Sequence, residues 1–108
     1  MTENIKRALN PWQPMTRPID IAQLGKLAEE CNELGSAIAR CLIQGIDERE
    51  PETGKLNREW LEDEIADVTA KIAQVTEFYA LNNERIFRRV IAKMRGLETW
   101  HAMLGDPV

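Results

Sequence analysis

The 108 residues are the length of one domain, and a domain this small buries only a modest core, so we expect self-association to add to its stability. Asp and Glu number 18 against 14 Lys and Arg, which gives a net charge of −4. An acidic surface repels nucleic-acid phosphates and anionic membranes on average, and this excludes polymeric DNA or RNA as the expected partner.

The beginning of the chain contains Pro11, Pro14 and Pro18, which interrupt any continuous helix. We predict a proline-containing arm over residues 1–18, with at most a short helix over residues 2–9. The remaining residues, 19–108, are predicted to form one helical domain.

The predicted domain begins with a long amphipathic helix from Ile19 to the stop signal at Gly45. Cys31 and Cys41 lie about 15 Å apart along this helix, too far for a disulfide. The sequence also has no apolar run that would span a bilayer and no signal-peptide start. We therefore expect a reducing cytoplasm and no membrane partner.

Two further helices are predicted after a polar loop over residues 44–57. Asn57 is expected to cap a helix that runs to about Ala80, and Asn82 or Asn83 to cap a third helix that ends near Gly105. Apolar positions recur every three or four residues in each helix, so we predict an all-α fold, an antiparallel bundle of three main helices completed by self-association. The apolar positions expected inside the third helix are Ile86, Phe87, Val90, Ile91, Met94 and Leu97.

Two pairs of acidic residues have matching positions on the first two helices. Glu30 and Glu33 are three residues apart, as are Glu64 and Asp67, so each pair is adjacent on its helix surface. Both pairs lie to the same rotational side of the apolar stripe, and an antiparallel pairing would bring them to one face. Four converging carboxylates need a compensating cation, and all-oxygen ligands favour Mg²⁺, with Mn²⁺ as a substitute. The alternative is that these acids form a solvated helix surface.

The same acids carry a resemblance to a known family. Residues 27–34 read LAEECNEL and residues 62–68 read EDEIADV. In this order, they resemble the motifs of the MazG-like all-α nucleoside triphosphate pyrophosphohydrolases, a family that includes dimeric dUTPases and dCTP pyrophosphatases. The resemblance covers about residues 19–94.

The resemblance implies hydrolysis of a (deoxy)nucleoside triphosphate to the monophosphate and pyrophosphate, with a role such as cleansing of the nucleotide pool. It implies that Mg²⁺ is held by the catalytic residues Glu30, Glu33, Glu64 and Asp67. A metal there would orient the phosphates and activate water. Three helices on so small a chain leave apolar seams exposed, so we expect a homodimer or homotetramer.

Substrate contacts are expected from two other parts of the chain. Lys93 matches the family's phosphate-binding position, and Arg89 and Arg95 are further candidates on the same helix, although a solvated surface explains them equally. Trp12 and Gln13 resemble the base-covering position of dCTP-hydrolysing relatives, which implies a preference for deoxypyrimidine nucleotides. Trp60, one turn before Glu64, is a third candidate for base binding, and packing is the alternative for either tryptophan.

Two other functions remain open. A non-catalytic helical dimerisation module would use the acids only for solubility. A phosphoribosyl-ATP pyrophosphohydrolase-like enzyme would keep the metal chemistry and change the substrate.

Overall fold

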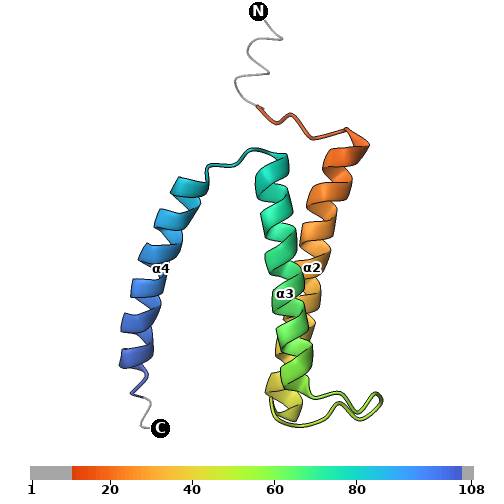
Figure 1. Cartoon of the computed structure of the whole chain (residues 1–108), viewed down its shortest axis with the longest axis vertical. Coiled ribbons are helices and arrows are strands. Elements are labelled where there is room, and N and C mark those ends of the chain that lie inside the picture. Colours follow the sequence, from red (N-terminus) through yellow and green to blue (C-terminus); the bar gives the residue numbers. More distant parts are fainter. Residues whose placement is uncertain (1–10, 106–108) are drawn as a thin grey trace, which may run out of the picture. The chain divides into compact units, whose positions relative to one another are not determined.

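The computed structural model describes residues 11–105, and the short helix expected over residues 2–9 lies outside them. It contains three helices, α2 (Pro18–Gln44), α3 (Asn57–Phe78) and α4 (Asn83–Met103), and no strand among the described residues beyond an isolated bridge between Arg49 and Leu56 (Figure 1). The predicted all-α class is therefore confirmed. The chain divides into two compact units, Met1–Lys71 and Ile72–Val108.

Helix α2 begins and ends as the sequence predicts. Pro18 lies in the first turn, where its missing N–H is not needed, and the preceding Arg17 donates from Nε to Asp20 Oδ2 at 2.8 Å. At the other end Gly45 has a φ of 103°, a conformation that favours glycine, and its N–H donates to the carbonyl of Cys41 at 2.9 Å.

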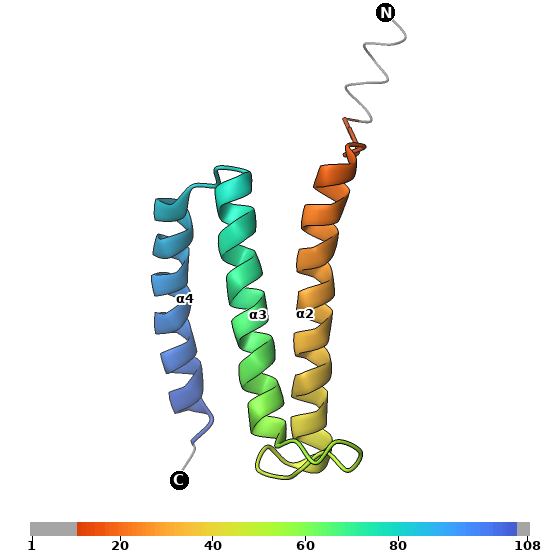
Figure 2. The ribbon, with the colours of Figure 1, turned by 45° about the vertical axis from the view of Figure 1, so that its right-hand side comes forward.

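Helix α2 and the first part of α3 form an antiparallel hairpin. At one end the Cys41 thiol contacts the carbonyl of Asn57 at 3.8 Å, and at the other Lys71 donates to Gln23. Figures 1 and 2 show the two helices side by side, joined by the loop between Gln44 and Asn57. The acidic pairs of the two helices are thereby brought to similar levels along the hairpin.

Asn57 does not cap α3 as predicted. Its side chain is fully buried and donates from Nδ2 to Gln44 Oε1 at 3.1 Å and to the Gly45 carbonyl at 3.0 Å. Its Oδ1 accepts no hydrogen bond from the described residues. The amide satisfies acceptors at the end of α2 instead, so Asn57 joins the end of α2 to the start of α3.

Helix α4 follows a turn at the end of α3. Asn82 caps it, because its Oδ1 accepts from the backbone N–H of Arg85 at 3.0 Å, as one of the two predicted caps would. The apolar residues expected inside this helix are exposed in the single chain, and their burial by self-association stays a prediction: Ile86, Phe87, Val90, Ile91, Met94 and Leu97.

The buried part of the chain is small and partly polar. The buried apolar residues in the described part of the chain are Ala37, Val68 and Val75, whereas Ile21 of α2 and Ile65 of α3 are 59% and 50% exposed. A two-helix hairpin covers one side of each helix, so part of a broad apolar stripe stays in water. None of the described helices combines the length and the apolar character needed to cross a bilayer.

Candidate metal centre

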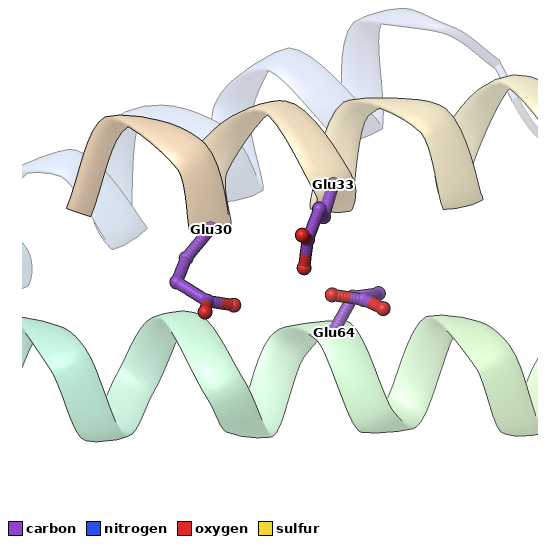
Figure 3. Close-up of side chains that lie close together, drawn as sticks. All are labelled: Glu30, Glu33 and Glu64. Carbon is purple, nitrogen blue, oxygen red and sulfur yellow. The ribbon is translucent and has the colours of Figure 1, made fainter. Parts of the chain in front are cut away.

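Three of the four predicted metal ligands meet between α2 and α3. Glu30 and Glu33 extend from α2 toward α3, and Glu64 extends from α3 toward them (Figure 3). One carboxylate oxygen from each lies within 4.8 Å of the others. The i, i+3 spacing directs the first two to the same side of α2, and the antiparallel pairing supplies the third.

Two oxygens of this acidic cluster (Glu30, Glu33 and Glu64) are buried without a partner. Glu30 is only 9% exposed, and its Oε2 accepts no hydrogen bond from the described residues. Glu64 Oε2 is buried too, and it also accepts no hydrogen bond from the described residues. A buried carboxylate oxygen without a donor or cation is unfavourable, so both atoms are available to a ligand that brings positive charge.

The electrostatics of Glu33 show the same lack of compensation. Loss of surrounding water raises the pKa of the Glu33 carboxyl above its usual 4.5, although the residue is exposed. The nearby charges of Glu30, Glu64 and Glu29 raise this pKa further, in that order, and Lys26 acts against them. The negative charges near Glu33 thus outweigh the positive charge of Lys26.

Asp67, the fourth predicted ligand, is not part of the cluster. Asp67 is exposed, and its carboxylate is not among the three that lie within 4.8 Å of one another. It follows Glu64 by three residues and is therefore its neighbour on the surface of α3. The structure thus brings together three of the four predicted acids and places the fourth beside them.

Lys26 belongs to this region and was not predicted from the sequence. Its Nζ lies 3.3 Å from Glu29 Oε1 and 3.3 Å from Glu30 Oε1. These two carboxylates raise the pKa of the lysine, Glu30 first. The order Lys-x-x-Glu-Glu on one helix is a weak signal that could have identified it, since i, i+3 and i, i+4 residues are neighbours.

Trp60 lies one turn before Glu64, as predicted, but its ring is already in contact with cations. Lys55 Nζ is 4.3 Å from the ring centroid and Arg40 Cζ is 5.2 Å from it. Lys55 also pairs with Asp63. A base that stacks on a face covered by a cation must displace that cation. Local spacing in the sequence could not predict either basic residue as a neighbour of Trp60, because Lys55 comes from the loop and Arg40 from α2.

The predicted base-binding arm is exposed in the structure. Trp12 is 82% exposed and Gln13 is exposed as well, in the segment that precedes α2. This segment joins α2 at Pro18, twelve residues before Glu30, or about 18 Å along a helix that rises about 1.5 Å per residue. The structure does not bring either side chain to the acidic cluster.

The predicted phosphate-binding residues are all exposed on α4. Arg89 and Lys93 are four residues apart and line one depression of the helix surface together with Trp100. Arg95 follows Lys93 by two residues and therefore points to the other side of α4. Arg89 and Lys93 thus lie on one side of α4, and Arg95 lies on another.

The acidic cluster fits a hard divalent cation. Its donors are carboxylate oxygens from two helices, the type that Mg²⁺ and Mn²⁺ prefer, and two of those oxygens are buried and unpaired. Comparisons with protein-family models, curated proteins and solved structures find no match for this chain.

Proposed function

We propose that the protein is a Mg²⁺-dependent pyrophosphohydrolase that converts (deoxy)nucleoside triphosphates to the monophosphate and pyrophosphate. The main support is the acidic cluster, in which Glu30, Glu33 and Glu64 approach within 4.8 Å. The motif resemblance of the same residues supplies the reaction, because the cluster alone would suit any divalent-ion site.

The roles of the side chains follow from their positions. Glu30, Glu33 and Glu64 would hold the ion, and Asp67 would complete the set from the adjoining surface of α3. A Mg²⁺ ion bound there would neutralise phosphate charge and lower the pKa of a coordinated water. Hydrolysis forms one bond between water oxygen and phosphorus, breaks the α–β phosphoanhydride and releases a proton with the pyrophosphate.

Basic residues would hold the phosphate chain, whose charge exceeds that of one or two Mg²⁺ ions. Arg89 and Lys93 are the best candidates on α4, because they share one surface, and Arg95 is a weaker one. Trp12 and Gln13 remain our candidates for the base, and with them a preference for deoxypyrimidine nucleotides. The cations on the ring make Trp60 a weaker candidate than the sequence alone indicates.

Self-association is part of this proposal. Exposed apolar side chains run along all three helices, and α4 buries none of its residues in the single chain. A dimer or tetramer would complete a helical bundle by covering these surfaces. Light scattering at micromolar concentration should report more than the 12.4 kDa of one chain.

The direct test is a pyrophosphate-release assay over the common ribo- and deoxynucleoside triphosphates. We expect turnover that requires MgCl₂, that MnCl₂ supports and that EDTA stops. The matched control is Glu33→Gln, which removes the charge of a ligand and keeps its shape. No release from any nucleotide, or equal release by wild type and the variant, would contradict the proposal.

A further inference from the structure

Lys26 connects a solvated helix surface to the acidic cluster. Its ammonium contacts Glu29, which is exposed, and Glu30, which is buried, at 3.3 Å each. The lysine side chain itself is 51% exposed. Half of the side chain already lies in water, so the ammonium can move from Glu30 into solvent and be hydrated there.

Glu30 is the carboxylate that most needs this contact. A charge that is nine-tenths buried is strongly unfavourable without compensation, and the Lys26 ammonium lies on Oε1 only. The other oxygen, Oε2, is buried with no partner among the described residues. Glu30 is therefore half compensated in the ion-free chain, by a cation that belongs to the same helix.

A divalent ion in the acidic cluster would compete for the same charge. It would take electron density from the Glu30 carboxylate and would repel an ammonium 3.3 Å from that group. Lys26 and the ion therefore cannot both gain the full attraction of Glu30. Two ligands that bind one group in this way weaken each other by the same factor, whichever binds first.

We propose that Lys26 is the resident counter-cation of the acidic cluster: it stabilises the ion-free protein through Glu30 and lowers the affinity of the cluster for Mg²⁺. This inference depends on the proposed function only in so far as the cluster binds a divalent ion. Lys26 is then a positioning residue that acts through Glu30 and sets the Mg²⁺ concentration at which an ion occupies the acidic cluster. No role in the chemical step is implied.

An ordinary helix ion pair would behave differently. Such a pair would stabilise the protein equally with and without Mg²⁺, and its removal would leave the metal affinity unchanged. The counter-cation stabilises only the ion-free form. The two roles are separated by measuring Mg²⁺ affinity together with thermal stability in both forms.

The test compares wild type with Lys26→Gln and Lys26→Arg. Isothermal titration with MgCl₂ should give a Kd about three- to tenfold lower for Lys26→Gln, the range expected when a partly exposed cation next to a ligand is removed. Lys26→Arg keeps the charge and should stay near wild type. In EDTA the Tm of Lys26→Gln should fall, and its rise on addition of saturating MgCl₂ should exceed that of wild type.

Arg58→Gln is the matched control. It also removes one positive charge and one ion pair, but its partner Asp47 lies in the loop, outside the acidic cluster. Its Mg²⁺ affinity should change by less than that of Lys26→Gln. If both variants change equally, the effect comes from overall charge and the inference is wrong.

Further outcomes distinguish a failure of the role of Lys26 from a failure of the metal centre. Unchanged Mg²⁺ affinity in Lys26→Gln, with normal binding by wild type, overturns the role of Lys26 and leaves the proposed function intact. No Mg²⁺ binding by wild type overturns the metal centre and this inference together. If Lys26→Gln does not fold, ¹³C-methylated lysine spectra of wild type give the answer, because the Lys26 signal should shift on Mg²⁺ addition and an unmoved signal contradicts the exchange.

Discussion

The loop end and the middle of the same hairpin differ in how their charged groups are paired. Near the loop, Asp47 pairs with Arg58 at 2.8 Å, Lys55 pairs with Asp63, and the buried amide of Asn57 donates two hydrogen bonds. In the acidic cluster, by contrast, Glu30 and Glu64 each bury an oxygen that has no partner among the described residues, and Lys26 contacts only the other oxygen of Glu30.

The pKa values follow the same division. The hydrogen bond from Arg58 lowers the pKa of Asp47, and the backbone N–H of Thr53 lowers that of Glu50, so these loop acids are stabilised as anions. The pKa of Glu33 is raised instead. The loop acids are paired within the chain, whereas we propose that an external cation completes the acidic cluster.

The largest expected effect is on activity, and it should come from the cluster alone. Glu33→Gln and Glu64→Gln should each lower kcat/KM for pyrophosphate release by about a hundredfold or more, since even residues that only support metal ligands cost tenfold to a hundredfold. The helical circular dichroism should remain. Near wild-type turnover by both variants would remove the metal assignment.

Asp67→Asn decides whether the fourth acid takes part. As a ligand it should cost about as much as Glu64→Gln, because the loss of a charged donor is the same. The measurement is kcat/KM beside circular dichroism. Retained activity would restrict the metal centre to Glu30, Glu33 and Glu64.

The next effect should be on stability and should come from the loop end. Asn57→Ala leaves the part-buried acceptors Gln44 Oε1 and Gly45 O without their donor, which costs about 1–3 kcal/mol. Denaturant unfolding measures this loss, and the exposed Asn32→Ala should stay within about 0.5 kcal/mol of wild type. Equal stability of the two variants would show that Asn57 does not join the end of α2 to the start of α3.

A smaller effect on stability should be an increase, whereas most substitutions lower the stability of a protein. Because the folded pKa of Glu33 is above 4.5, the ion-free folded chain binds this proton more tightly than the unfolded chain, and the ionised Glu33 destabilises the fold at neutral pH. In EDTA, Glu33→Gln should therefore have a slightly higher Tm than wild type at pH 7. The difference should shrink as the pH falls toward 4, and a lower Tm for the variant at pH 7 would contradict this account.

The smallest effect should come from the exposed pair at the loop. Arg58 lowers the folded pKa of Asp47 below 3.8, so the pair stabilises the fold above that pH and the stabilisation is lost as the pH falls through the folded value. Asp47→Asn should lower the Tm at pH 7 by less than Asn57→Ala does. Thermal scans in strong acid should bring the variant and wild type together, and a constant difference would assign the effect to packing.

The helices and the acidic cluster were accessible to sequence reasoning because they depend on local spacing. Pro18 and Gly45 mark the ends of α2, Asn82 caps α4, and the i, i+3 spacing of Glu30 and Glu33 directs both to one face. Short-range rules of helix geometry are enough for such features.

The remaining features depend on contacts between distant segments. Asn57 looks like a cap in the sequence, but the end of α2 offers its amide two acceptors. Arg40 and Lys55 meet on Trp60 only because the helix pairing and the loop bring them there. Asp67 matches the motif equally well as Glu64, and only side-chain placement separates the two.

The claim that the acidic cluster is a divalent-ion site is tested most directly by titrating MgCl₂ into metal-free wild type and following the Tm. An ion that binds the folded chain at one hundred times its Kd stabilises it by about 2.7 kcal/mol, so we predict a rise of several degrees that saturates and that Glu33→Gln lacks. A Tm that does not respond to Mg²⁺ or Mn²⁺, or that rises equally in Glu33→Gln, would contradict the claim.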